Sequence, residues 1–430
     1  MKKIMIKQFK LLAESNFLTP GFKDQFRLIK VLLCASKALA WRCFSFRHRT
    51  WFQLLTFFPD SKTPLYFRKR NNGHNPLLLP IYVLFIGIFL ASSNGFSQPV
   101  NSRAALFESD EVFQITLRGE MKALMKDRSG DPVYYPLELA YTFQNNPETT
   151  IPVEVRTRGH FRRLRENCFY PPLLINFKKN GPQEHTLFSE QNKLKLVMPC
   201  KQDQYVIYEW LAYQIYSLVT PNSFRARLVK VQLEESGKKP KDPFYGVLLE
   251  EEKQMARRNG LIPVERDLRP QEVQRQPFLE MALFEYLIGN TDWSIQYLQN
   301  IKLIAKDTNA APIAVPYDFD HSGIVNAPYA HPAPELKMNS IKQRRYRGYC
   351  IQAMDVYAET IARFQELKPA IYAIYQNNPL IDEKYQKTTI RFLDEFYETL
   401  QNPQKLEKDL LYPCDPNGTG NVVIQGLREH

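Results

Sequence analysis

The order of two hydrophobic periods along the chain constrains its fold most. Short segments with alternating apolar residues, typical of strands, dominate up to about residue 250, although one helical segment interrupts them. Helical spacing, with apolar residues three and four positions apart, dominates from about residue 276 onward. We therefore expect an α+β body of two lobes, with a strand-rich N-lobe, a mainly helical C-lobe and a ligand cleft between them.

The predicted elements follow these periods and the turn residues between them. Strands are expected at 112–119, 153–163, 171–179 and 193–198, as a hairpin at 225–235 and 244–252, and at 300–305 and 312–317. Helices are expected at 203–219, at 277–289 and from about 352 to the C-terminus. The predicted domain limits are a basic leader at 1–74, an apolar export segment at 75–98, the N-lobe at 99–275 and the C-lobe at 276–430.

The net charge of +12 comes entirely from the leader. Residues 1–75 contain 15 Lys and Arg against 3 Asp and Glu, and the other 355 residues contain 42 of each sign. A chain that binds nucleic acid is expected to carry its basic surface on the folded body. We therefore predict no nucleic-acid partner.

An apolar run from Leu77 to Ala91 follows the basic segment "RKRNNGH". A basic flank, an apolar run and then small or polar residues is the layout of a secretory signal peptide. We predict an exported protein, periplasmic or extracellular, that contacts a membrane only through this segment if the segment stays uncleaved as an anchor. The residues before it are either a cytoplasmic tail or sequence upstream of the true start.

Four cysteines remain after the leader, namely Cys168, Cys200, Cys350 and Cys414. Their spacing does not match the paired cysteines of a zinc site. One or two disulfides fit an exported chain, and buried free thiols fit the pattern equally well. The pairing stays open at this point.

Carboxylates gather at the ends of apolar elements around one predicted hairpin. Asp292 in "GNTDW" follows a helix, Asn300 begins a strand, and Asp318 and Asp320 in "PYDFDHSG" follow the next strand. A loop, hairpin and loop can bring these side chains to one point. One Asp would accept the proton of a substrate hydroxyl, and the other oxygens would hold Mg²⁺ against phosphates.

These motifs resemble the CotH-like spore-coat kinase family, within the atypical kinases that include the HipA-like and phosphoinositide kinases. The similarity extends to "VRTRGHFRR", "YVIYEWLAYQIYSLV" and "LVKVQL…FYGVLLEEE", and covers about residues 151–330. The gap of eight residues from Asp292 to Asn300 is longer than in ordinary protein kinases, and no glycine-rich phosphate loop precedes Lys195.

The resemblance implies a two-lobed atypical protein-kinase-like fold that uses Mg²⁺ and ATP or another nucleotide. It implies that Asp292 is the catalytic residue and that Asn300, Asp318 and Asp320 are metal ligands. Lys195 and Glu209 have the order of the nucleotide-binding Lys and its Glu partner, with Lys178 and Lys193 as competitors for the Lys role. The acceptor would be a protein or glycan hydroxyl.

Two other functions remain open from the sequence. The chain could be a catalytically inactive binding module of the cell envelope, or a different metal-dependent transferase that uses the Asp318/Asp320 pair. Five arginines from Arg156 to Arg165 form either an anion clamp or a solvated strand face with its flanking turn.

Overall fold

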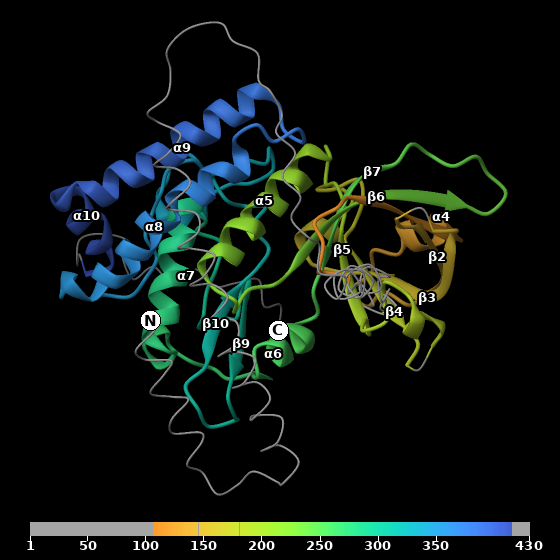
Figure 1. Ribbon diagram of the computed structural model, residues 1–430, viewed down its shortest axis with the longest axis horizontal. Helices are drawn as coiled ribbons and strands as arrows, with labels where there is room; N and C mark the ends of the chain where they lie inside the picture. Colours follow the sequence, from red (N-terminus) through yellow and green to blue (C-terminus); the bar gives the residue numbers. More distant parts are fainter. Residues whose placement is uncertain (1–105, 145, 180, 415–430) are drawn as a thin grey trace, which may run out of the picture. The chain divides into compact units, whose positions relative to one another are not determined.

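Seven strands close into a barrel, which lies on the right in Figure 1. The computed structural model describes residues 106–144, 146–179 and 181–414, which belong to one compact unit, Ser97–His430. The strands are β1 (Phe113–Gly119), β2 (Tyr135–Thr142), β3 (Thr149–Thr157), β4 (Leu173–Phe177), β5 (Lys193–Val197), β6 (Ala226–Glu235) and β7 (Phe244–Leu249). Their order around the barrel is β1-β2-β3-β4-β5-β7-β6.

Alternating apolar side chains build the interior of the barrel. On β3, Ile151, Val153 and Val155 are buried, while the residues between them are more exposed. Neighbouring strands pair antiparallel, except that β1 and β6 pair in parallel from Phe113↔Val229 to Gly119↔Glu235. That parallel pair closes the sheet and leaves neither β1 nor β6 as a free edge.

The rest of the described chain forms a second part made of a second sheet and helices. Its sheet has the order β10-β9-β8, with β8 (Ile262–Val264), β9 (Ile301–Ala305) and β10 (Ile313–Pro316) all antiparallel. The helices are α4 (Met121–Lys126), which packs on the barrel, α5 (Gln204–Val219), α6 (Glu252–Arg258), α7 (Arg275–Ile288), α8 (Ala358–Tyr375), α9 (Glu383–Gln401) and α10 (Pro403–Leu410). Short 3₁₀ turns are Phe161–Arg163, Pro182–His185, Pro270–Glu272, Pro334–Leu336, Met354–Tyr357 and Tyr412–Cys414.

Helices α5 and α7 form the centre of a second hydrophobic core. Both are buried on nearly all sides, as expected of helices that are apolar around most of their circumference. Helix α5 contacts the barrel strands β6 and β7 as well as helices α7 and α8. It therefore connects the barrel to the helical part, and α7 extends this core to strand β10.

The prediction of a two-lobed, kinase-like fold is wrong. The strand-rich residues close into a barrel, and the part that follows contains a three-stranded sheet and a long stretch without regular helix, 317–353, beside its helices. Alternation identifies strands but not their partners. The β1–β6 pairing, which joins residues more than 110 positions apart, was therefore invisible in the sequence.

Both pairs of cysteines are disulfide-bonded. Cys168 pairs with Cys200, and Cys350 pairs with Cys414. In the part of the chain that the structure describes, no helix is both long and apolar enough to cross a membrane. The predicted leader and the apolar run Leu77–Ala91 lie outside the described residues.

Candidate functional site

Asn300 and Asp318 lie at the open end of the β9–β10 hairpin. The last strand pair is Ile301↔Pro316, and beyond it the amide of Tyr317 still donates to the carbonyl of Asn300 at 3.0 Å. Asn300 has φ 51° and Asp318 has φ 67°, which is the left-handed region. Residues other than glycine adopt it at a cost, and such residues cluster at functional sites.

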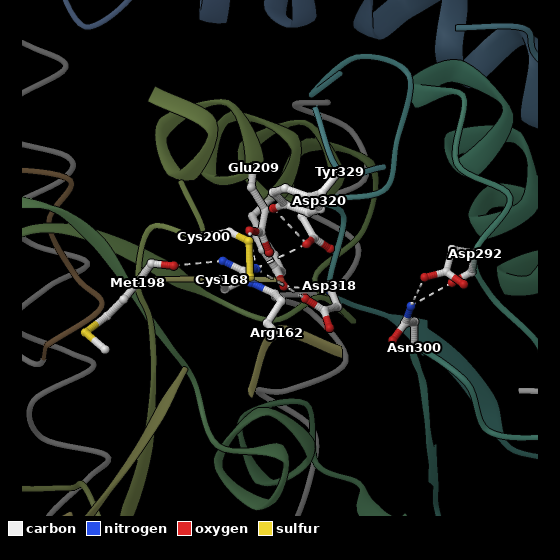
Figure 2. Close-up of polar contacts among 11 residues, drawn as sticks. Arg162, Cys168, Met198, Cys200, Glu209, Asp292, Asn300, Asp318, Asp320 and Tyr329 are labelled. Atoms are coloured by element: carbon white, nitrogen blue, oxygen red, sulfur yellow. Dashed lines mark hydrogen bonds and ion pairs between the residues drawn. A yellow bond between two sulfur atoms is a disulfide. The ribbon is translucent and has the colours of Figure 1, made fainter. Parts of the chain in front are cut away.

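Asp292 turns toward this hairpin rather than capping a helix. Helix α7 ends at Gly289 in the left-handed conformation, and Asn290 Oδ1 accepts the amide of Asp292 at 3.0 Å. Asn300 Nδ2 donates to Asp292 Oδ2 at 3.0 Å and to the Asp292 carbonyl at 2.7 Å, as Figure 2 shows for the side chains. Gln299 Nε2 donates to the other carboxylate oxygen.

The surroundings of Asp292 make its carboxylate more basic than usual. Burial raises its pKa, and the nearby charge of Asp320 adds to the rise. His321, Arg347 and the hydrogen bond from Asn300 act in the opposite direction. The net result is a carboxylate that binds a proton more readily than a solvated one.

Arg162 is the centre of a buried ionic cluster beside the hairpin (Figure 2). Its Nη1 lies 3.3 Å from both Glu209 Oε2 and Asp320 Oδ2, and 4.0 Å from Asp318 Oδ1. Its Nη2 donates to the carbonyl of Met198 at 2.9 Å. Of the two open interpretations of the arginine cluster, the solvated one is wrong for Arg162.

Two further contacts hold this cluster in place. The hydroxyl of Tyr329 donates to Asp320 Oδ2 at 3.0 Å. The Cys168–Cys200 disulfide connects the loop after Arg162 to the segment that supplies the Met198 carbonyl. The guanidinium is thus fixed by groups from several separate parts of the chain.

Three carboxylates share this one guanidinium, so the cluster carries an excess of negative charge when all of them are ionised. Burial first, and then the charges of Asp320 and Asp318, raise the pKa of Glu209 to about 8 against the opposing effect of Arg162. The pKa of Asp318 is also raised, first by desolvation and then by Asp320. An added cation would relieve this repulsion.

Lys195 on β5 lies near Asp318 without a close carboxylate partner. Its Nζ lies 4.5 Å from the centroid of the Tyr317 ring, and among the described residues no carboxylate oxygen is within 4.0 Å of it. Desolvation first, and then the positive charges of Arg158 and Lys302, lower the pKa of Lys195 to about 7. Lys195 and Arg158 both interact electrostatically with Asp318, whereas Lys302 is paired with Glu252 at 3.1 Å, so two cations next to Asp318 suit an anionic ligand.

The structure brings most of the predicted residues together. Asp292 bonds to Asn300, Asp318 and Asp320 both lie within ion-pair distance of Arg162, and Asp318 follows the residue paired with Asn300. The Lys195–Glu209 partnership suggested by the resemblance does not occur, because Glu209 pairs with Arg162. Asp318 and Asp320 both follow strand β10, as the sequence predicted.

The predicted metal ligands differ in how well they suit Mg²⁺. The Asp318 side chain is 39% exposed, whereas the carboxylate of Asp320 is buried against Arg162 and Tyr329. Within the described ranges, no group of three His, Cys, Asp or Glu residues is placed to hold a metal ion. One carboxylate and the Asn300 amide oxygen suffice for Mg²⁺ only if phosphate oxygens complete its shell.

The sequence did not single out two residues of this region. Tyr329 has no motif that marks it. Glu285 is buried on α7 beneath the Asp292 loop, where burial first and then Asp292 raise its pKa. A signal for Glu285 existed, since it is a carboxylate within the apolar helix "PFLEMALFEYLIG".

Comparison of the chain with models of protein families finds no match. A search of curated proteins finds no similar sequence either.

Proposed function

We propose that the protein binds a nucleotide with Mg²⁺ at the open end of the β9–β10 hairpin and transfers phosphate to a protein or glycan hydroxyl. The observation that supports this most is the position of Tyr317, which pairs with Asn300, precedes Asp318 and lies with its ring 4.5 Å from the amine of Lys195. A carboxylate, an amide oxygen and a cation without a close partner are the groups that hold a metal-bound phosphate.

Each residue has a distinct role in this proposal. Asp318 and the amide oxygen of Asn300 hold the metal ion, which neutralises phosphate charge when it is bound. Lys195 contacts the phosphate, and the approach of an anion returns its amine to the charged form. Asp292, with its raised pKa, accepts the proton of the attacking hydroxyl.

Glu209 and Asp320 act through Arg162 in this arrangement. Both carboxylates lie 3.3 Å from the guanidinium, which also lies 4.0 Å from Asp318. Arg162 thereby orients Asp318 toward the hairpin and supplies positive charge next to the metal ligand. Glu209 is thus a positioning residue rather than a nucleotide ligand.

We also propose that the protein works in an exported, oxidising compartment. The apolar run Leu77–Ala91 and the two disulfides support this location. The nucleotide would then have to be supplied outside the cytoplasm, or the donor would be another phosphorylated compound available there.

A second candidate function is binding of a phosphorylated ligand without catalysis. The hydrogen bonds of Asp292 favour it, because both carboxylate oxygens already accept amides of Gln299 and Asn300. A proton acceptor has to be free to receive a substrate hydroxyl. The third function is a transferase that needs both Asp318 and Asp320 as metal ligands. It has less support, because the carboxylate of Asp320 is already bonded to Arg162 and Tyr329.

The test is transfer of labelled phosphate from ATP with Mg²⁺ by the purified protein, beside thermal unfolding with the same nucleotide. We expect Asp292→Asn to lower the rate by ~100-fold or more while stabilisation by the nucleotide persists. Asp318→Asn should abolish both phosphate transfer and stabilisation by the nucleotide. Glu398→Gln, at an exposed position on α9, should change neither of these two properties. Stabilisation without transfer would favour the binding module, and the absence of both effects would contradict the proposal.

A further inference from the structure

A groove with a strongly basic rim lies at the barrel, away from the candidate site. It encloses about 740 Å³ and is lined by helix α4, by the segment 165–170 and by the β6–β7 hairpin with its connecting loop. Figure 1 shows that hairpin extending from the barrel on the side where α4 is labelled. Seven of the thirteen lining residues are Lys or Arg, and Glu235 is the single acidic one.

The positive charges of the groove have little compensation from carboxylates. The six cations at its rim are Lys122, Lys126, Arg165, Lys238, Lys239 and Lys241. Within the described part of the chain, no carboxylate oxygen lies within 4.0 Å of their side-chain nitrogens, and the one lining carboxylate, Glu235, accepts the backbone amide of Lys122 at 2.6 Å. Like charges held together in this way attract an anionic ligand strongly.

The seventh cation, Arg128, shapes the groove instead of serving as a free charge. Its guanidinium donates to the carbonyls of Met125, Cys168 and Phe169 at 3.1, 2.8 and 2.6 Å. These bonds connect the end of α4 to the segment next to the Cys168–Cys200 disulfide. The two walls are therefore held at a fixed separation.

Apolar side chains lie between these charges. Met121, Met125, Leu233 and Tyr170 line the groove, and Phe169 is 70% exposed at its edge. The backbone of Phe169 is fixed, because its amide donates to the Cys200 carbonyl at 2.8 Å and its carbonyl accepts from Arg128. An exposed ring on a rigid backbone, beside adaptable methionines, is suited to binding apolar side chains.

From this combination we infer that the groove binds an extended acidic peptide segment of a partner protein, one that carries apolar side chains between its carboxylates. A bilayer surface is flat and does not enter a groove, whereas a single extended chain does. An acidic glycan would match the lysines but would leave Phe169 and Met125 without apolar partners. The inference does not depend on the proposed phosphate transfer.

The experiment measures fluorescence anisotropy of a labelled peptide of alternating Glu and Leu with the full chain. Reversing three charges, Lys238→Glu, Lys239→Glu and Lys241→Glu together, should weaken binding by ~10-fold or more. The matched control replaces three exposed lysines on α9 and α10 by glutamate, namely Lys384, Lys387 and Lys405. It should change the affinity for the peptide by less than ~2-fold. A peptide with Gln in place of Glu should not bind.

Phe169→Ala tests the apolar part of the inference separately. It should weaken binding of the Glu/Leu peptide by roughly 10-fold. Binding of an all-Glu peptide should be nearly unaffected, because only the Leu side chains contact the ring. Equal losses from the two triple variants would overturn the inference. Binding to vesicles of phosphatidylglycerol or to an acidic polysaccharide, without binding of the peptide, would overturn it as well.

Discussion

Gly289 and Gly323 lie against each other at the point where the two site loops meet. The amide of Gly323 donates to the carbonyl of Gly289 at 3.0 Å, and the next amide, that of Ile324, donates to Ile288 at 2.9 Å. This contact connects the loop that carries Asp292 to the loop that carries Asp318 and Asp320. Gly323 is therefore needed for close packing at this contact.

Adding a methyl group at Gly323 should push its loop against the neighbouring segment Ile341–Lys342. Its Cβ would lie 2.7 Å from the Ile341 carbonyl oxygen, a backbone atom that cannot move alone. We expect Gly323→Ala to lower the free energy of unfolding by about 1–3 kcal/mol in a urea titration. Gly130→Ala, where no atom lies within 4 Å of the added Cβ, is the control and should stay within ~0.5 kcal/mol. Equal effects of the two substitutions would contradict this packing.

Removing the charge of Arg162 should destabilise the protein severely. Above pH 8, where Glu209 is ionised, Arg162→Met leaves the buried carboxylates of Glu209 and Asp320 without their cation, and the expected loss in free energy of unfolding is about 3–5 kcal/mol. The same change at the neighbouring Arg163, whose guanidinium donates to the Gly130 carbonyl at 3.3 Å, should cost under ~1 kcal/mol. Adding Glu209→Gln to Arg162→Met should recover part of the lost stability, because Gln carries no charge that needs a partner. If the double variant recovered none, the role of Arg162 would be steric rather than electrostatic.

The sequence was sufficient to identify most of the regular elements and the part of the site that contains Asp292 and Asn300. Apolar spacing located helices α5 and α7 and the β9–β10 hairpin to within a few residues, because both faces of these elements are buried. It missed β2 and β8. The barrel could not be predicted, since no local pattern marks the pairing of β1 with β6.

The site could be predicted only where its residues are close in the sequence. Asp292 and Asn300 belong to one loop and strand, so their contact follows from a local turn. Arg162 reaches Asp320 from 158 positions away, and its sequence context resembles a solvated basic strand. Whether a charged side chain is buried depends on the tertiary packing around it, so the sequence could not decide between the two interpretations of Arg162.

The buried carboxyl of Glu209 should make stability depend on pH. Its pKa is raised from 4.5 to about 8, so between these values the native state keeps a proton that the unfolded chain has released. The contribution of Glu209 to the free energy of unfolding therefore falls as the pH rises from about 4.5 to 8, by up to ~1.4 kcal/mol per pH unit. Urea titrations at several pH values should show a flatter dependence for Glu209→Gln, while Glu398→Gln keeps the slope of the unchanged protein. An unaltered slope in Glu209→Gln would contradict the assignment.

The amine of Lys195 should react at a pH at which ordinary lysines are still protonated. Desolvation first, and then Arg158 and Lys302, lower its pKa from 10.5 to about 7, so about half of the amine is neutral at pH 7. Acylating reagents attack the neutral form only, so peptide mapping by mass spectrometry should show labelling of Lys195 with a midpoint near pH 7. A nucleotide bound with Mg²⁺ should lower the labelling rate if Lys195 contacts its phosphates, and Asp318→Asn should remove that protection without abolishing the labelling. A midpoint near 10.5 would show that the amine is solvated and would remove Lys195 from the site.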